Sequence, residues 1–450
     1  MRTIVEPKEF IAKLWGKQKI NYTDTFRMMR YVIRDDYDGK VLLHNVVTGQ
    51  LVVLDQREAE LLNKLPLEYC SEMERLVENH YLVTDQFDEN RQVVKMREVL
   101  RKLDEVQRKP GIIHYTILPT TACNARCYYC FEHGSKIVTM SEQTANSVVD
   151  YIDSHCALNR QVSISWFGGE PTVASKRIDQ ICEGLKNKGI QITSDITTNG
   201  YLFDEELAIR ARKLWNLQLA NITIDGTENT YNRIKSYVDA KDNPYIRVLT
   251  NVGLLLEQRI RVSLRMNFDL GNYHEFKDLL EDVKNRFGEN PLIQIHVHPI
   301  IGQFVTNEGV VSHGSDKWFE EKIVELNDMA RNAGLLKPKD ELPYLKYKGC
   351  QANNKSAATI TPEGSLVRCP EQYGDEQVAG NIWAGVTNSE IVQSWQVFSE
   401  YPKCKECVLF PYCVRLSRCS AQDRCCYLSE FIQQYQKNMK HKLCSYKKAR

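Results

Sequence analysis

Six short apolar segments recur along the middle of the chain, and longer stretches with hydrophobic residues at helical spacing separate them. Segments that are almost continuously apolar are typical of strands buried on both faces of a sheet. Their alternation with helices predicts an α/β fold in which helices cover a parallel sheet. The predicted strands are residues 112–118, 162–168, 190–198, 220–225, 261–267 and 292–298, and the predicted helices are 141–155, 175–189, 204–215, 248–259 and 273–287.

A hairpin pattern marks the first part of the chain. The apolar-rich segments 41–45 and 51–55 stand on either side of the turn sequence NVVTGQ, as the two strands of a β-hairpin do. Short helical patterns follow the hairpin. We therefore expect residues 1–87 to form a small domain of strands and short helices.

Two helix starts in this domain are predicted from capping residues. Asp55 precedes a stretch of helical periodicity and has Glu58 three residues later, and Ser71 has Glu74 at the matching position. Such pairs satisfy backbone N–H groups at the N-terminus of a helix. The charged segment that follows, residues 88–110, is predicted to be a helical linker.

The composition describes an ordinary globular protein of more than one domain. The chain has 450 residues, 42% of them hydrophobic and 26% charged, and a net charge of +1. This balance gives no case for binding nucleic acid or an anionic membrane surface. The first residues lack the apolar core of a signal peptide, and no apolar run approaches the length that spans a membrane. We expect a cytoplasmic protein.

Cysteine is the residue type whose distribution departs most from this ordinary picture. The chain has 15 cysteines, and nine of them follow residue 349. In a large chain without an export signal, clustered cysteines more often bind metal or carry out redox chemistry than form disulfides.

Three further cysteines lie in the sequence CNARCYYC at residues 123–130, five residues after the first predicted strand. Active sites on parallel sheets gather at the C-terminal ends of the strands, so this loop falls on the functional edge. A cubane iron–sulfur cluster has four irons, and three thiolates leave one of them open to a small molecule.

This motif, Cx3Cx2C with an aromatic residue before its last cysteine, resembles the signature of the radical S-adenosylmethionine (SAM) superfamily. The sequence FGGEP at 167–171, directly after the second predicted strand, resembles the GGE motif of the same superfamily. The resemblance covers residues 111–335. It implies a partial (β/α)6 barrel of the TIM type.

The chemistry implied by this resemblance is reductive cleavage of SAM. An open iron of the [4Fe–4S] cluster chelates SAM, and an electron from the cluster yields a 5′-deoxyadenosyl radical that abstracts hydrogen from the substrate. The residues implied are Cys123, Cys127 and Cys130 as cluster ligands, Tyr129 against the adenine, Gly168, Gly169 and Glu170 at the SAM ammonium group, Thr198 and Asn199 at the end of the third strand, and Arg265 and Asn267 on the fifth strand.

Simpler interpretations stand beside each motif. The three cysteines alone also fit part of a zinc site, and the glycines of FGGEP also fit a tight turn. Because both motifs directly follow their strands, the radical SAM interpretation is favoured. Asp225, which ends the fourth predicted strand, is a candidate catalytic acid in the pocket, and the alternative is a turn residue before Gly226.

The cysteines of the last region, residues 336–450, have a second pattern. Cx13Gx4C, starting at Cys350, is followed by Cx2Cx5C, starting at Cys404. This pattern resembles the SPASM domain, a C-terminal extension of many radical SAM enzymes that carries two auxiliary [4Fe–4S] clusters. The ligands implied are Cys404, Cys407, Cys413 and one of Cys425 and Cys426 for a distal cluster, and Cys350, Cys369 and Cys419 for a proximal cluster.

Two features depart from the SPASM pattern. Five residues rather than three precede Cys419, and VRLSR stands where that family has a Gly-Gly pair. With three ligands at the proximal cluster, either Cys425 or Cys426 supplies the fourth, or one iron is open to a substrate thiolate. Zinc binding by the CxxC pair is the alternative to iron–sulfur chemistry.

Enzymes that combine these two resemblances mostly modify ribosomally made peptides or proteins. The hairpin and short helices of residues 1–87 are similar to the winged-helix element that grips a leader peptide by adding a strand to its sheet edge. We therefore expect a radical SAM peptide maturase that installs a thioether or carbon–carbon crosslink. The alternatives are an anaerobic sulfatase-maturing enzyme that forms formylglycine, and a non-catalytic iron–sulfur or zinc protein that binds peptides. The implied partners are a precursor peptide with a leader sequence, or a sulfatase, and an electron donor such as flavodoxin or ferredoxin.

Overall fold

The computed structural model of the chain describes residues 1–16, 18, 23–108, 110–132, 134–300, 303–306, 309–312, 316–337, 340–398, 402–419 and 428–448. Its contacts divide the chain into two compact units, each built from separate stretches of sequence. The central unit comprises Lys109–Pro338 and Gln351–Trp395. The terminal unit comprises Met1–Arg108, Lys339–Cys350 and Gln396–Arg450.

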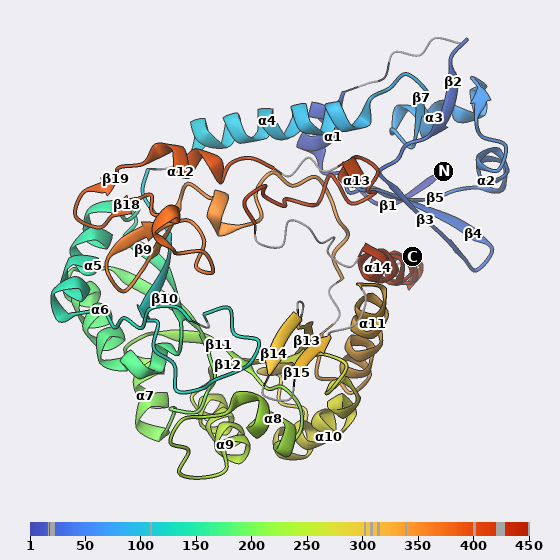
Figure 1. Ribbon diagram of the computed structural model, residues 1–450. Helices are drawn as coiled ribbons and strands as arrows, with labels where there is room; N and C mark the ends of the chain where they lie inside the picture. The colour runs from blue at the N-terminus through green and yellow to red at the C-terminus, as the bar shows by residue number, and fades with distance from the viewer. Residues whose placement is uncertain are drawn as a thin grey trace. The chain divides into compact units, whose positions relative to one another are not determined.

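A ten-stranded sheet forms the central unit, in the order β13-β12-β11-β10-β9-β8-β16-β17-β18-β19 (Figure 1). The six strands β8–β13 run parallel in chain order. All six predicted strands are confirmed, most of them to within a few residues. They are β8 (His114–Thr120), β9 (Gln161–Gly168), β10 (Gln191–Thr198), β11 (Leu217–Thr223), β12 (Arg261–Phe268) and β13 (Ile293–Pro299).

The sheet continues beyond β8 with four strands that the sequence analysis did not identify. Strand β16 (Ala357–Ile360) pairs in parallel with β8. The short strands β17 (Ser365–Val367), β18 (Gly380–Asn381) and β19 (Gly385–Val386) follow in antiparallel pairing. Residues 351–395, which belong to the predicted cysteine-rich region, therefore extend the α/β sheet.

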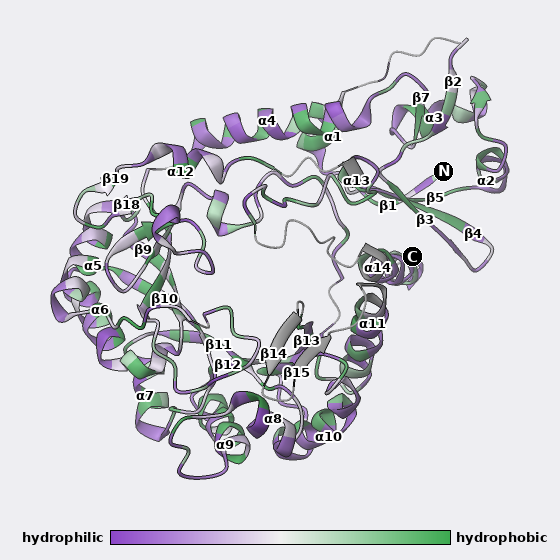
Figure 2. Ribbon diagram, in the orientation of Figure 1, coloured by the Kyte–Doolittle hydropathy of each residue, from purple (hydrophilic) through white to green (hydrophobic). Residues whose placement is uncertain are grey.

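Helices of the central unit lie along the outer side of its parallel strands (Figure 1). Figure 2 shows that these helices carry both hydrophobic and hydrophilic residues, as helices with one face on a sheet do. The five predicted helices are confirmed, and α8 and α11 are additional. The helices are α5 (Glu142–His155), α6 (Ser175–Asn187), α7 (Glu205–Lys213), α8 (Glu228–Lys235), α9 (Pro244–Glu257), α10 (Phe276–Phe287) and α11 (Asp316–Asn332).

The remaining elements of the central unit are short. A hairpin of β14 (Gln303–Thr306) and β15 (Gly309–Ser312) stands apart from the large sheet. One turn of 3-10 helix, Pro171–Ala174, follows the FGGEP motif. Helix α12 (Ser389–Ser394) closes the second stretch of the unit.

The terminal unit contains two small antiparallel sheets. The first has the order β1-β5-β4-β3, with β1 (Arg2–Val5), β5 (Leu51–Val53), β4 (Lys40–Asn45) and β3 (Val32–Tyr37). The predicted hairpin is confirmed, because β4 and β5 pair antiparallel. The second sheet has the order β6-β2-β7, with β6 (Leu67–Glu68), β2 (Thr25–Met28) and β7 (Leu82–Thr84).

One of the two predicted capping boxes is present. Asp55 accepts a hydrogen bond from the Glu58 backbone N–H at 3.0 Å, and the Glu58 side chain accepts one from the Asp55 backbone N–H, also at 3.0 Å. The box at Ser71 is wrong: residues 71–73 form a 3-10 turn, and the Ser71 hydroxyl donates to Glu72 rather than accepting from Glu74. Ser71 itself lies inside the 3-10 turn, and α3 begins only at Glu74, so Ser71 does not stand at the N-terminus of an α-helix.

The other helices of the terminal unit come from both ends of the chain. They are α1 (Glu9–Trp15), α2 (Gln56–Leu62), α3 (Glu74–Glu78), α4 (Glu89–Gln107), α13 (Pro402–Lys405) and α14 (Leu428–Lys448). Helix α4 confirms that the predicted linker is helical. Its buried residues Val93 and Leu100 join one hydrophobic core with Met439 and Leu443 of α14. Among the described residues, no helix is both long and apolar enough to cross a membrane.

Candidate functional site

The sequence-predicted site residues of the central unit meet at the C-terminal edge of the parallel strands. The cysteine loop 123–130 follows β8, and FGGEP follows β9. Thr198 ends β10, Asp225 follows β11, and Asn267 lies near the end of β12. Because parallel strands place their carboxyl ends at one edge, five separate stretches of sequence build one site.

The three thiols of the loop lie near one another and are partly buried. Burial raises the pKa of the Cys123 thiol to about 12, and the neighbouring Cys127 and Cys130 add to the shift. Burial also raises the pKa of Cys127, against an opposing effect of the Lys235 charge. Deprotonation of the three thiols is therefore costly unless a metal compensates the thiolate charges, as a bound metal does.

Hydrogen bonds tie the cysteine loop to two other strand ends and to the end of one helix. The Asn199 side-chain amide, after β10, donates to Asn124 Oδ1 at 2.7 Å. The Tyr128 hydroxyl donates to Asp269 Oδ2 at 2.5 Å, just beyond β12. The Arg126 backbone N–H donates to the Lys235 carbonyl, at the end of α8, at 2.8 Å. The loop is thus held over the sheet edge from several directions.

A buried ion pair lies at the centre of this anchoring. The Lys235 ammonium is 2.8 Å from Asp225 Oδ2, and the two side chains are 2% and 0% exposed. Lys235 also donates to the Tyr129 hydroxyl at 2.9 Å and to Thr223 Oγ1 at 2.7 Å. Lys235 was not predicted as a site residue, because a single lysine in a short helix that was itself not predicted carries no signal of its own.

Asp225 faces this network and not an open pocket. Its Oδ2 accepts from the Tyr129 hydroxyl at 2.5 Å, and its Oδ1 accepts from the Asn267 side-chain amide at 3.0 Å. Both carboxylate oxygens are therefore occupied by protein groups. In this geometry Asp225 holds Tyr129 and Asn267 in place, whereas its predicted role is that of a catalytic acid.

The glycines of FGGEP allow a close approach of two backbones. Gly168 has φ +117°, and a Cβ on it would lie 2.3 Å from the Thr120 carbonyl oxygen. A Cβ on Gly169 would lie 2.5 Å from the carbonyl oxygens of both Thr121 and Ala122. Only residues without a Cβ fit here. The tight-turn interpretation is thus correct for Gly168, and the turn brings this segment against the start of the cysteine loop.

Glu170 is fully buried and saturated by protein donors. Its Oε1 accepts from the Thr198 hydroxyl at 2.7 Å and from the Thr172 hydroxyl at 2.5 Å, and its Oε2 accepts from the Asn199 backbone N–H at 2.7 Å. Burial raises its pKa above the ordinary value, although these hydrogen bonds oppose the shift. Glu170 thereby fixes the end of β10, which carries two of the predicted SAM-binding residues.

Arg265, the remaining predicted residue, is partly exposed on β12. Its buried Nε atom has no hydrogen-bond partner among the described residues. The same strand carries Asn267, whose amide also donates to the Tyr129 hydroxyl at 2.9 Å. The Arg265 Nε–H group is therefore available as a hydrogen-bond donor on the strand that carries Asn267.

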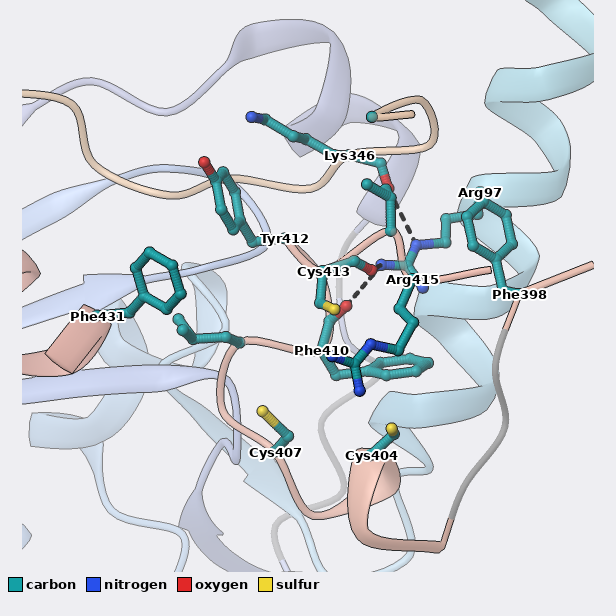
Figure 3. Close-up of a pocket in the computed structure, with 13 residues that line it drawn as sticks. Arg97, Lys346, Phe398, Cys404, Cys407, Phe410, Tyr412, Cys413, Arg415 and Phe431 are labelled. Carbon is teal, nitrogen blue, oxygen red and sulfur yellow. Dashed lines mark hydrogen bonds between the residues drawn. The ribbon is translucent and has the colours of Figure 1, made fainter. Parts of the chain in front are cut away.

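The terminal unit contains a pocket of about 310 Å³ into which Cys404 and Cys407 point their sulfur atoms (Figure 3). Cys413 also lines it. Among the described residues, the pocket wall includes three cationic side chains and no carboxylate, and the remaining contacts are mostly apolar. The lining residues are Arg97, Lys346, Gly349, Phe398, Cys404, Cys407, Leu409, Phe410, Tyr412, Cys413, Val414, Arg415 and Phe431.

The other predicted cluster ligands are less closely defined. Cys350 is exposed and Cys419 is partly buried in the terminal unit, and Cys369 follows β17 in the central unit. Cys425 and Cys426 lie outside the described residues. Within the described part of the chain, no three His, Cys, Asp or Glu side chains converge on one point as a single metal ion requires. Ligands of a cubane need not do so, because each thiolate binds a different iron.

Both cysteine sets fit the chemistry of iron–sulfur clusters. Each offers three thiols, which are the ligands that such clusters prefer. In the terminal unit, the pocket adds apolar walls and positive charge around its thiols. A cluster with thiolate ligands is anionic, so this lining suits it.

The comparison with protein families gives a direct match for the central unit. Residues 117–283 match the family model described as "Radical SAM superfamily". The predicted resemblance is thereby confirmed: this part of the chain is a radical SAM domain.

Curated relatives of the chain act on different substrates. A radical SAM cyclopropyl synthase, TigE, of Paramaledivibacter caminithermalis is 24% identical over 169 residues, which span 32% of this chain and 36% of that protein. A GTP 3′,8-cyclase of Clostridium perfringens is 24% identical over 290 residues, 60% of this chain and 84% of that enzyme. A cysteine-type anaerobic sulfatase-maturating enzyme of Clostridium perfringens is 27% identical over 364 residues, 70% of this chain and 92% of that enzyme.

Solved structures of two proteins, anSMEcpe and SuiB, share the fold. The structure of anSMEcpe with bound AdoMet and the Cp18Cys peptide has a TM-score of 0.56 at 17% identity, and covers 75% of this chain and 100% of that one. Streptococcus suis SuiB bound to its precursor peptide SuiA has a TM-score of 0.51 at 15% identity, and covers 86% of this chain and 94% of that one. At these identities the likeness shows the fold alone.

Proposed function

We propose that this chain is a radical SAM maturase, which cleaves SAM reductively and abstracts a hydrogen atom from a ribosomally made peptide. The observation that carries the proposal is the cysteine loop 123–130 at the strand ends, where Thr121 and Ala122, directly before the loop, lie against Gly169. The match to the radical SAM family over residues 117–283 supports the same chemistry. A thioether or carbon–carbon crosslink on the peptide is the product that we propose.

In this proposal Cys123, Cys127 and Cys130 hold a [4Fe–4S] cluster, which supplies the electron that cleaves SAM when both are bound. The chain's own residues provide the geometry. Gly168 and Gly169 allow a close approach of two backbones at the start of the loop, and their backbone groups are proposed to take part in SAM binding. Thr198 and Asn199, fixed by Glu170, present polar groups at the end of β10.

Tyr129 and Arg265 complete the proposed SAM site. Three hydrogen bonds hold the Tyr129 hydroxyl, so its ring has a fixed orientation for contact with the adenine. Arg265 has an unused Nε donor on β12, beside Asn267. A guanidinium donor suits a carboxylate or a ribose hydroxyl of SAM.

The peptide substrate is proposed from the parts of the chain beyond the radical SAM domain. Since relatives that share this domain include a GTP cyclase, the domain by itself does not define the substrate. Support for a peptide comes from anSMEcpe and SuiB, which share the fold and whose structures contain peptides. In the terminal unit, β1 and β3 are the outer strands of a small sheet. We propose that residues 1–87 use such an edge to bind a leader peptide by strand addition.

The cysteines of the last region are proposed to bind two auxiliary [4Fe–4S] clusters. The pocket formed around Cys404, Cys407 and Cys413 supports the distal one. An electron donor such as flavodoxin or ferredoxin would reduce the radical SAM cluster. Maturation of a sulfatase to its formylglycine form is the second candidate function, and the relative in Clostridium perfringens that covers 70% of this chain favours it.

Anaerobic reconstitution tests the proposal. Three [4Fe–4S] clusters require about twelve iron atoms per chain, and incubation with SAM and dithionite is expected to yield 5′-deoxyadenosine. Replacing Cys123, Cys127 and Cys130 with alanine is expected to abolish SAM cleavage, whereas C156A, a cysteine outside every proposed site, is expected to retain it. Zinc in place of iron, or no SAM cleavage by the loaded wild-type chain, would refute the proposal.

The two substrates are separated by genomic neighbourhood and by assay. A short open reading frame rich in cysteine beside the gene favours the peptide maturase, and a sulfatase gene favours the alternative. Mass spectrometry of the encoded peptide after incubation then shows either a loss of hydrogen with a new crosslink, or the conversion of one Cys or Ser to formylglycine.

A further inference from the structure

Arg97 is a buried cation without a carboxylate partner. It lies on α4, the predicted linker helix, and is 4% exposed. Among the described residues, no Asp or Glu lies within ion-pair distance of its guanidinium. Burying a charge costs free energy unless an opposite charge or several hydrogen bonds compensate it, so the surroundings of Arg97 need an explanation.

Backbone carbonyls take up most of the hydrogen bonds of Arg97. Its Nη2 atom donates to the carbonyl oxygens of Phe410 at 2.5 Å, Pro411 at 3.0 Å and Cys413 at 2.5 Å, and its Nε atom donates to that of Lys346 at 3.0 Å. These acceptors belong to the loop that carries Cys413, the third cysteine of the Cx2Cx5C pattern, and to the irregular segment around Lys346. Arg97 thereby fixes the loop conformation.

Two aromatic rings enclose the same guanidinium. The Phe398 ring centroid is 5.1 Å from its central carbon atom, and the Phe410 centroid is 4.8 Å from it. Figure 3 shows the guanidinium between these rings and the Cys413 segment. Carbonyls and rings orient and solvate a cation but carry no net charge, so no group among the described residues neutralises the positive charge of Arg97.

A second cation, Lys346, and three cysteines line the pocket beside Arg97, and no carboxylate is found among the described lining residues. The Lys346 ammonium lies 4.2 Å from the Tyr412 ring centroid, a neutral partner. Two such cations beside three thiols favour an anionic occupant, and a cluster bound by thiolates supplies that charge.

We propose that Arg97 is the positioning residue and the charge partner of the auxiliary cluster bound by Cys404, Cys407 and Cys413. This inference rests on the proposed function, because it takes these cysteines as cluster ligands. Net charge and hydrogen bonding near the sulfurs set the potential of such clusters. A nearby positive charge favours the more negative, reduced form, so Arg97 raises the reduction potential of this cluster.

The test compares R97Q, R97K and R101Q in the C123A/C127A/C130A background, where the radical SAM cluster is absent. Arg101 is the matched control, since it lies one turn further along α4, bonds to Gln396 and does not line the pocket. Iron and sulfide content are measured first. A redox titration followed by electron paramagnetic resonance then gives the midpoint potential of the signal that C407A removes.

We expect R97Q to shift this midpoint to a lower potential, R97K to keep it near the parent value, and R101Q to leave it unchanged. If R97Q fails to load the cluster, loading of R97K at the parent potential supports the charge role. The proposal is overturned if R97Q loads fully with an unchanged potential, or if R97K changes as much as R97Q does. A parent protein that shows no signal dependent on Cys407 instead refutes the auxiliary cluster, and with it that part of the proposed function.

Discussion

The Lys235 ammonium lies 2.8 Å from Asp225 Oδ2, and less than 3% of either side chain is exposed. Both members of this pair bond to the hydroxyl of Tyr129, in the loop that carries Cys123, Cys127 and Cys130. It links α8, the end of β11 and Tyr129 through a continuous set of hydrogen bonds. The loop geometry therefore depends on two charges that sequence patterns do not connect.

Replacing Lys235 with methionine is expected to lower the free energy of unfolding by about 3–5 kcal/mol, because it leaves the Asp225 carboxylate buried without a counter-charge. Urea denaturation measures this change. The double variant K235M/D225N is expected to recover part of the loss, since it removes both charges. K277M, which breaks an exposed pair with Glu281, is the control and is expected to change stability little. Equal effects of K235M and K277M would contradict a structural role for the buried pair.

Replacing Tyr129 with phenylalanine separates two roles of this residue. The variant keeps the ring but loses the hydroxyl that bonds to Asp225, Lys235 and Asn267. We expect a stability loss of about 1–3 kcal/mol from the unsatisfied buried partners, with SAM binding weakened less than in Y129A. Unfolding curves and calorimetric titration with SAM measure the two effects. If Y129F and Y129A weaken SAM binding equally, the ring does not contribute to the site.

Replacing Gly169 with alanine is expected to displace the cysteine loop. The added Cβ would meet two backbone carbonyl oxygens at 2.5 Å, and neither can rotate away as a side chain can. We expect loss of iron from the radical SAM site and at least a tenfold loss of SAM affinity, which corresponds to about 1.4 kcal/mol. G253A is the control and should retain both iron and SAM affinity. Gly253 lies inside α9, and the nearest atom to its added Cβ would belong to the Phe287 ring, at 3.8 Å. Normal iron content in G169A would refute the close-approach argument.

The terminal unit is expected to lose stability in mild acid. Burial lowers the pKa of His44 to about 4 and that of His80 to about 4, from an ordinary value of 6.5. The folded state thus prefers the neutral rings, and the unfolded state takes up protons first as the pH falls. The contribution of the two rings is complete above pH 6.5 and is lost between pH 6.5 and about 4.

The urea midpoint measured from pH 8 to pH 4 checks this expectation. H44Q removes one of the two groups and is expected to flatten the dependence between pH 6.5 and 4. H441Q, which replaces an exposed histidine on α14, should leave it unchanged. A midpoint that is constant over this range in the wild-type chain would be incompatible with two neutral buried histidines.

The sequence predicted the parts of the fold that local patterns encode. The six parallel strands of the central unit are short segments rich in apolar residues that alternate with helical patterns, and this alternation gave their positions. The capping box of Asp55 and Glu58 is also a local signal, and it was confirmed. Ser71 carried the same signal but precedes a helix of one turn, where propensity cannot outweigh the tertiary context.

The remaining features depend on contacts between distant residues. Strands β16 to β19 have two to four residues each, which is too short for a period of two to be recognised. Lys235 and Arg97 look like ordinary surface residues in charged helices, and only their burial shows their role. The motif residues of the site were predicted because the family resemblance supplied them. Lys235, which donates a hydrogen bond to the Tyr129 hydroxyl, was not predicted.

The pairing of β16 with β8 has a consequence for synthesis of the chain on the ribosome. Strand β8 is complete at residue 120, but its second neighbour is not made until residue 360. Throughout that interval the nascent chain exposes the backbone of β8 as an unpaired sheet edge, which is a template for wrong association. Fragments that stop before β16 are therefore expected to aggregate even though they contain all six parallel strands.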